Sequence, residues 1–287
     1  KMKILKKMIL KIIKRFQKKV PVYIPVFKGN ILQDRVAVIT GASKGIGYEI
    51  ANQFRNNGAS VIITGRNENT LKDAVAKLKK NNCDGIIDYL VMDNTKIDEF
   101  DIKFKELLTK LNGKKIDILV NNAGCNVHKS YMNITEEDFD KVFDTNLKSV
   151  YFLTKQFVNY FIKNEIKGNI LNISSSSSLR PGVTPYTIAK WGMKSFTQGM
   201  AKSLVPYGIT VNSLAPGPTH TPMHVSNGDE GLDEFSNPTG RMADPVELAN
   251  MAVILVSKMG NMVVGDTVYM TGGAGVLTLD DVSYDIY

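Results

Sequence analysis

The chain has little cysteine and little histidine. Its 287 residues include two cysteines, Cys83 and Cys125, and neither stands in a C-x-x-C pair. This argues against a disulfide framework and a cysteine-bound zinc, and it is typical of a protein in a reducing cytoplasm. His220 and His224 are four residues apart, but prolines surround them and no third ligand is evident, so no metal site is predicted.

Acidic residues are absent from the first thirty positions, which hold nine lysines and one arginine. This segment has a local charge of +10 while the whole chain has +8, so the remaining residues carry −2. The excess of positive charge therefore lies in the N-terminal segment. It gives no reason to expect that the body of the protein binds nucleic acid.

A long apolar run is also missing from the N-terminal segment. The longest run in residues 1–20 is three residues, far short of the roughly 20 needed to cross a bilayer. The apolar residues there share one side of a helix, opposite most lysines, which predicts a basic amphipathic helix. Such a helix binds either an anionic membrane surface, here peripherally at the inner face of the membrane, or a protein surface. Both alternatives remain open.

The rest of the chain alternates between apolar, β-rich runs and helix-length segments. Thr135, followed by three acidic residues, is one of several capping signals that predict where a helix begins. The seven runs expected to form strands are residues 35–40, 60–65, 88–93, 116–124, 169–174, 209–217 and 266–273. Strands that alternate with helices predict a parallel sheet covered on both faces.

The expected fold class is thus α/β, with one doubly wound, Rossmann-type domain and a seven-stranded parallel sheet. No linker divides this region. The predicted organisation is a basic N-terminal extension (1–30), a catalytic domain (31–276) and an acidic C-terminal tail (277–287).

A glycine-rich turn follows the first expected strand and leads into a helix, with glycines at 41, 45 and 47. Such a turn lets the backbone approach a pyrophosphate, which then lies at the N-terminus of the helix. The second strand ends in Thr64-Gly65-Arg66, where an NAD site usually offers a carboxylate. Arg66 and Lys44 therefore favour a 2′-phosphate, and NADP(H) over NAD(H). The alternative is that both are solvated surface cations.

Three further motifs occur in order: NNAG at 121–124, Tyr186-x-x-x-Lys190, and PGPTHTPM at 216–223. With the glycine turn, they make the chain resemble the short-chain dehydrogenase/reductase family, including its 3-oxoacyl thioester reductases, over about residues 32–276. The resemblance implies hydride transfer between a nicotinamide and a carbonyl or secondary alcohol. It also implies a homo-tetramer or homo-dimer.

The resemblance assigns Tyr186 as the general acid in reduction and Lys190 as the residue that holds the nicotinamide ribose. Four residues apart, they share one face of a helix. A cation within a few ångströms lowers the pKa of a phenol by about one to three units. We therefore expect Lys190 to lower the pKa of Tyr186.

The family also places a serine after the fifth strand, to orient the substrate oxygen. Alignment from Asn172 selects Ser175, in a loop two residues shorter than the commonest family spacing, with Ser174 and Ser176 as alternatives. Asn146 matches the helix asparagine that completes a proton relay. The further cofactor contacts that the resemblance implies are Gly41, Ser43, Lys44, Gly45, Ile46, Gly47, Arg66, Asp93, Asn121, Ala123, Gly124, Gly217, Thr219 and Thr221.

The leading hypothesis is an NADP(H)-dependent carbonyl reductase or alcohol dehydrogenase in the cytoplasm. Its substrate is a small molecule such as a 3-oxoacyl thioester, a sugar or a lipid-linked precursor. Two alternatives stand beside it. One is an epimerase or dehydratase that uses the same tyrosine and lysine, and the other is an inactive, membrane-tethered binding protein on the same fold.

Overall fold

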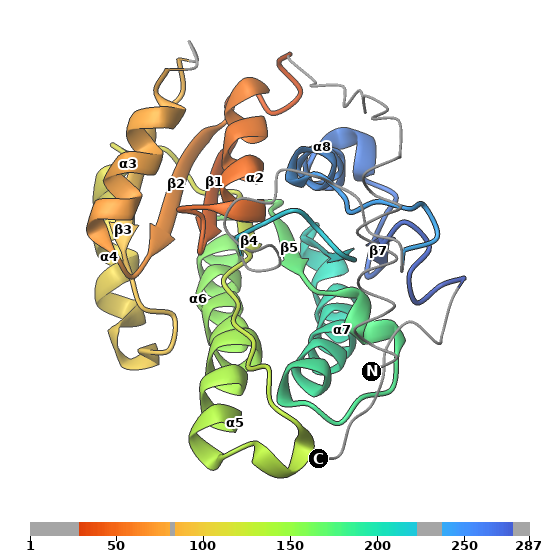
Figure 1. The fold of residues 1–287 in the computed structure, drawn as a ribbon. Coiled ribbons are helices and arrows are strands. Elements are labelled where there is room, and N and C mark those ends of the chain that lie inside the picture. The colour runs from red at the N-terminus through yellow and green to blue at the C-terminus, as the bar shows by residue number, and fades with distance from the viewer. Residues whose placement is uncertain (1–28, 81–83, 223–236, 278–287) are drawn as a thin grey trace.

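The computed structural model describes residues 29–80, 84–222 and 237–277. Seven strands form one sheet in the order β3-β2-β1-β4-β5-β6-β7, and every neighbouring pair is parallel (Figure 1). The strands are β1 (Val36–Thr40), β2 (Ser60–Gly65), β3 (Ile87–Val91), β4 (Ile118–Asn121), β5 (Asn169–Ile173), β6 (Thr210–Pro216) and β7 (Thr267–Met270). The predicted α/β fold and its seven parallel strands are confirmed.

The strand order reverses between β1 and β4. From β1 the chain proceeds outward to β2 and β3, then returns to pair β4 with the other side of β1, so that Val38 lies between Ile62 and Leu119. In an open parallel sheet, ligands bind outside the carboxyl ends of the strands at such a reversal. The topology therefore predicts a binding crevice beyond Thr40 and Asn121.

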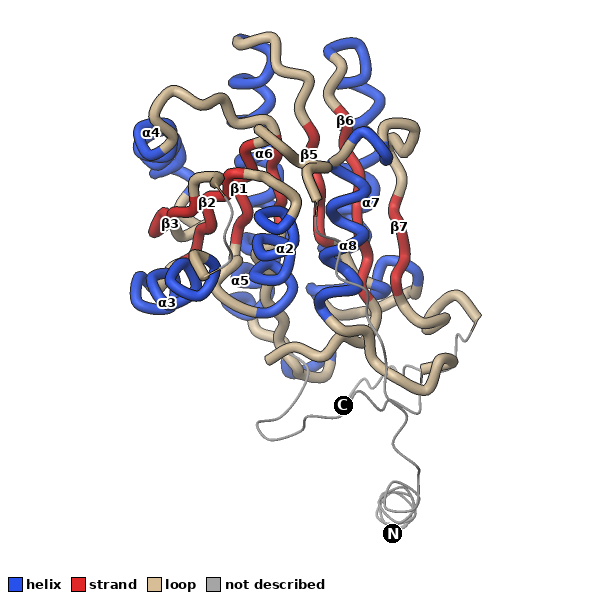
Figure 2. Tube along the Cα trace, turned by 90° about the horizontal axis from the view of Figure 1, so that it is seen from above, coloured by secondary structure: helices blue, strands red, loops and turns tan. Residues whose placement is uncertain are grey.

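Helices cover both faces of the sheet (Figures 1 and 2). They are α2 (Gly45–Asn56), α3 (Glu68–Leu78), α4 (Phe100–Lys110), α5 (Glu136–Phe143), α6 (Ser149–Lys163), α7 (Pro185–Leu204) and α8 (Pro245–Val256). Buried side chains of α2, α3 and α8 form one hydrophobic cluster with the sheet, and those of α4, α6 and α7 form the other. This is the two-sided cover that a parallel sheet needs.

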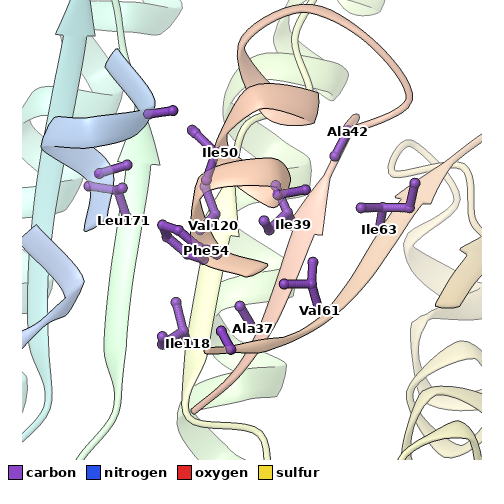
Figure 3. Packing of buried hydrophobic residues seen from close by; sticks show 14 of the residues in the cluster. Ala37, Ile39, Ala42, Ile50, Phe54, Val61, Ile63, Ile118, Val120 and Leu171 are labelled. Atoms are coloured by element: carbon purple, nitrogen blue, oxygen red, sulfur yellow. The ribbon is translucent and has the colours of Figure 1, made fainter. Parts of the chain in front are cut away.

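The cluster under α2 shows why the central strands are apolar throughout. All five residues of β1 are buried. Ile50 and Phe54 of α2 lie against the sheet near Ile118, Val120 and Leu171 (Figure 3). Because side chains alternate between the faces of a strand, a strand that is buried on both faces has no polar face to display.

The capping signal at Thr135 is confirmed. The Thr135 hydroxyl accepts a hydrogen bond from the backbone N–H of Asp138, and the Asp138 carboxylate accepts one from the backbone N–H of Thr135. This reciprocal pair begins α5. A π-helical turn (Asp144–Lys148) then connects α5 to α6.

Two predicted segments lie outside the described residues: the basic N-terminal extension of residues 1–30 with its amphipathic helix, except for residues 29 and 30, and the acidic tail of residues 277–287, except for residue 277. The domain limits at 30 and 277 stay a prediction. In the described part of the chain, none of the helices combines the length and the apolar character needed to cross a membrane.

Candidate active site in the cleft at the strand ends

One cleft with a volume of about 1520 Å³ extends along the carboxyl ends of the strands. The residues predicted for the cofactor that line it are Gly41, Ser43, Lys44, Gly45, Ile46, Gly47, Arg66, Asp93, Ala123, Gly124, Gly217, Thr219 and Thr221. The predicted catalytic residues that line it are Asn146, Ser175, Tyr186 and Lys190. The structure therefore brings together, in one space, motifs that are up to 180 residues apart in the sequence.

The glycine turn forms the floor of this cleft between β1 and α2. Gly41 has a φ of 63°, and a Cβ at this position would lie 2.7 Å from the Cα of Ala123. A side chain is thus excluded both by the left-handed backbone and by the neighbouring chain. The first turn of α2 carries no acidic residue, so the positive end of the helix dipole is available to an anion.

Asn121 is the one predicted cofactor contact that does not line the cleft. Its side chain is 2% exposed and donates to the hydroxyl of Thr154 and the side-chain oxygen of Asn172. The next residue, Asn122, lines the cleft instead, and its amide donates to the carbonyls of Thr40 and Gly41 at 2.8 and 3.0 Å. Asn122 therefore holds the glycine turn against the end of β4. Consecutive residues of a strand point to opposite faces, which separates the two asparagines.

Two cations lie at the end of the cleft that the second strand forms. Lys44 precedes α2, Arg66 follows β2, and both side chains are exposed. Asp93, beyond β3, accepts hydrogen bonds from the backbone and the hydroxyl of Thr95. This end of the cleft thus offers two cations to an anionic group, beside a carboxylate that is already hydrogen-bonded.

Helix α7 carries Tyr186 and Lys190 on one face. The helix begins cleanly because Pro185 occupies its first turn and the Thr184 hydroxyl accepts a hydrogen bond from the N–H of Thr187. The Lys190 Nζ atom donates to the carbonyl of Ile173 at 2.9 Å. It lies 5.5 Å from the centroid of the Tyr186 ring. The ammonium is therefore fixed to the end of β5 and faces the phenol.

The serine run is a structured turn directly after β5. Ser175 caps a 3-10 turn (Ser176–Leu179), and its hydroxyl accepts a hydrogen bond from the N–H of Ser177 at 3.1 Å. The same hydroxyl forms a hydrogen bond with Tyr186. The alternatives have other partners: Ser174 donates to the carbonyl of Lys190, and Ser176 accepts from Arg180. Among these three serines, the geometry favours Ser175 as the partner of the tyrosine.

Burial shifts the pKa values of both Tyr186 and Lys190. Removal from water raises the pKa of Tyr186 above its ordinary value of 10, against a smaller lowering by the hydrogen bond with Ser175. Burial also lowers the pKa of Lys190 from 10.5 to about 8. The expectation that Lys190 would lower the pKa of Tyr186 is therefore wrong for this state of the protein. The reason is that desolvation penalises the charged form of both groups.

Asn146 lies in the π-helical turn and is fully buried. Its Nδ2 atom donates to the carbonyls of Cys125 and Val142 at 2.8 and 2.9 Å. Its Oδ1 atom is buried and has no hydrogen-bond partner among the described residues. The site therefore retains a buried acceptor, as an asparagine that takes part in a proton relay requires.

These features identify the family when they are compared with known proteins. Residues 35–231 match the family model described as short chain dehydrogenase. The chain belongs to the short-chain dehydrogenase/reductase family. As a member, it is an oxidoreductase with a Rossmann-type domain.

Relatives in this family are similar over most of their length. The 3-oxoacyl-acyl-carrier-protein reductase FabG of Chlamydia muridarum is 34% identical over 248 residues, which cover 85% of this chain and 98% of that protein. The enzyme of the same name from Rickettsia bellii is 34% identical over 246 residues, with 84% and 97% covered.

Solved structures agree with the fold. A variant of actinorhodin polyketide ketoreductase with NADPH has a TM-score of 0.77 at 28% identity and covers 84% of this chain and 97% of its own. A short chain dehydrogenase from Burkholderia cenocepacia in complex with NADP has a TM-score of 0.76 at 25% identity and covers 86% and 100%.

Arg180 is one of the cleft residues that were not expected from the sequence. Arg180 lines the cleft although it is only 7% exposed, and its carbonyl accepts a hydrogen bond from the Trp191 indole at 2.7 Å. Its position directly after the serine run was the sequence feature that could have indicated a place in the cleft. Burial of an arginine at that place was not readable, because arginines are mostly exposed.

Proposed function

We propose that this short-chain dehydrogenase/reductase catalyses the NADPH-dependent reduction of a carbonyl, with 3-oxoacyl thioesters as the substrate class. The observation that carries the proposal is the group of Ser175, Tyr186 and Lys190 on the wall of a cleft that begins at the glycine turn. The names of the FabG relatives and the polyketide ketoreductase support this substrate class.

The chain's own residues supply the proton and the positioning. NADPH, when bound, supplies the hydride. Tyr186 donates its proton to the carbonyl oxygen as negative charge develops there, and Ser175 hydrogen-bonds the same oxygen. Lys190, beside the ring of Tyr186, stabilises the tyrosinate that results. Asn146 contributes its free Oδ1 atom as the acceptor that holds a water for re-protonation.

The protonation states of the resting site match the start of a reduction. A phenol with a raised pKa keeps its proton at neutral pH, so Tyr186 holds the proton that the carbonyl oxygen receives. Lys190, with a pKa of about 8, is mostly charged at pH 7. The resting site therefore holds the donor state that carbonyl reduction needs.

The choice of NADPH rests on the cations at the second strand. The exposed side chains of Lys44 and Arg66 line the cleft where the ribose 2′ position of a dinucleotide lies in this fold. An arginine binds phosphate with two parallel hydrogen bonds, whereas a carboxylate there suits the hydroxyls of NADH. The NADPH and NADP bound in two structural relatives support the same choice.

The decisive experiment is NADPH consumption with acetoacetyl-coenzyme A as the 3-oxoacyl thioester, measured by absorbance. Tyr186→Phe should lower kcat by about 10²- to 10⁴-fold, because the general acid is lost, with NADPH affinity unchanged. Tyr207→Phe, at a tyrosine that is 53% exposed, is the matched control and should behave as wild type. A wild-type protein that leaves NADPH unconsumed, or a Tyr186→Phe variant at full rate, contradicts the proposal.

We also propose that the protein acts in the cytoplasm as a homo-dimer or homo-tetramer. Exposed aromatic side chains on α6 and α7 support a contact between copies. Tyr151 and Trp191 are 51% and 41% exposed, and Tyr151 also packs on Phe196 with ring centroids 5.3 Å apart. Peripheral membrane contact through residues 1–20 stays a prediction.

A further inference from the structure

A chain of buried hydrogen bonds runs beneath the site. Asn121 donates to the Thr154 hydroxyl at 3.1 Å and to the side-chain oxygen of Asn172 at 2.9 Å. Asn172 donates to the Thr197 hydroxyl at 2.9 Å, and that hydroxyl donates to the carbonyl of Met193 at 2.8 Å. We call Asn121, Thr154, Asn172 and Thr197 the amide network. Each of its side chains is at most 2% exposed.

The amide network joins the elements that carry the catalytic residues. Its members lie on β4, α6, β5 and α7 in the order in which they are named. Helix α7 carries Tyr186 and Lys190, and α6 continues the π-helical turn that holds Asn146. One set of hydrogen bonds therefore connects both helices to adjacent strands of the sheet.

Two polar contacts connect α7 to neighbouring residues of β5. Lys190 binds the carbonyl of Ile173, and Thr197, two helical turns further on, binds the side chain of Asn172. The two contacts are about 10 Å apart along the helix axis, so together they oppose both rotation and sliding of the helix. Because Asn121 occupies the oxygen of Asn172, the amide of Asn172 has its N–H directed at Thr197.

We propose that the amide network is a positioning device for the reaction, and that Thr197 is its point of attachment on α7. The inference rests on the proposed carbonyl reduction. Neither Thr197 nor Asn172 lines the cleft, so they act through others. The network holds α7 where the Tyr186 hydroxyl meets Ser175, and a small roll of the helix would separate them.

The test compares a substitution that removes the hydroxyl of Thr197 with one that keeps it. Thr197→Val removes the hydroxyl and should lower kcat about 10- to 100-fold, since a displacement of about 1 Å in a catalytic group has an effect of this size. The KM values for NADPH and the thioester should stay within about twofold, because the residue is remote from both. Thr197→Ser keeps the hydroxyl and should restore kcat.

Two controls separate positioning from general damage. Ser203→Ala removes a hydroxyl that bonds the carbonyl four residues earlier in the same helix, as Thr197 does, but at an exposed site outside the network. Val253→Ala creates a cavity in α8, which belongs to the other hydrophobic cluster. Both should keep the wild-type kcat at a temperature where they remain folded. If Val253→Ala loses as much kcat as Thr197→Val, or if Thr197→Ser fails to restore it, the proposal is overturned.

A second readout does not depend on turnover. The ¹³Cζ resonance of Tyr186, assigned by its absence in Tyr186→Phe, reports the hydrogen bond of the phenol. It should shift in Thr197→Val and return in Thr197→Ser. An unchanged resonance in the folded Thr197→Val protein overturns the positioning role. An inactive wild type would instead contradict the proposed function. The Tyr186 resonance would still test whether the amide network positions the phenol.

Discussion

At the scale of single residues, the site places an ionisable pair in surroundings that oppose its charges. Lys190 is 3% exposed and its pKa falls to about 8, while the pKa of Tyr186 rises. A lysine that is charged at neutral pH and buried lowers the stability of the folded state. The arrangement therefore serves the reaction at the expense of stability.

Replacement of this lysine by a neutral residue should reveal that cost. Lys190→Met should raise the free energy of unfolding at pH 7 by up to about 3 kcal/mol, which is the shift from 10.5 to about 8 converted at 1.36 kcal/mol per pKa unit. The lost hydrogen bond to Ile173 reduces this gain. Reductase activity should be lost.

The stability gain of Lys190→Met should depend on pH in a definite direction. The folded-state pKa lies below the unfolded value, so the unfolded chain binds more protons between about pH 8 and 10.5, and wild-type stability from this group rises with pH across that window. The advantage of Lys190→Met should thus be full below pH 8 and shrink toward pH 10.5. Urea unfolding at pH 7 and pH 10 measures it, and a gain that is equal at both values would refute the role of burial.

At the scale of elements, the glycine turn is shaped by a close approach as well as by its backbone. Gly41 has a φ of 63°, and Gly113, between α4 and β4, has a φ of 83°. A Cβ at Gly41 would meet the backbone of Ala123, whereas a Cβ at Gly113 would have no atom within 4 Å. A comparison of the two glycines therefore separates the cost of a left-handed backbone from the cost of a steric clash.

Alanine at each position should therefore have different effects. Gly113→Ala should lower stability by about 1–2 kcal/mol, the cost of left-handed backbone for an ordinary residue. Gly41→Ala should cost more and should also weaken NADPH binding, because the end of β4 must move out of the cleft. Chemical denaturation and NADPH fluorescence titration check both effects. Equal stability loss in the two variants, with unchanged NADPH affinity, would show that the approach to Ala123 is unimportant.

The elements also show which parts of the site the sequence predicts. The strands and the Tyr186-Lys190 face follow from hydrophobic runs and helical spacing, which are local. The separate roles of Asn121 and Asn122 do not, because a shift of one residue in a strand reverses the face that a side chain takes. The pKa of Tyr186 depends on how closely distant segments surround it, and sequence spacing does not contain that burial.

At the scale of the whole molecule, the cleft unites residues from both halves of the sheet. The glycine turn and Arg66 belong to the first half, while Ser175, Tyr186 and Thr219 come from the second. A dinucleotide in this cleft contacts both halves, so its binding should stabilise the entire fold. A ligand at 100 times its Kd adds about 2.7 kcal/mol to the free energy of unfolding.

The cofactor preference should be visible in this stabilisation. NADPH should raise the midpoint of thermal unfolding more than NADH at equal concentration, because only NADPH carries the 2′-phosphate that Arg66 is proposed to bind. Arg66→Ser should weaken NADPH binding at least about tenfold, which corresponds to about 1.4 kcal/mol, and leave NADH binding unchanged. Lys79→Ser removes an exposed cation near the end of α3 that does not line the cleft and should preserve the preference. Greater stabilisation by NADH would contradict the proposed contact between Arg66 and the 2′-phosphate. An equal loss in Lys79→Ser would mean that the net charge of the surface, rather than a specific phosphate contact, accounts for the preference.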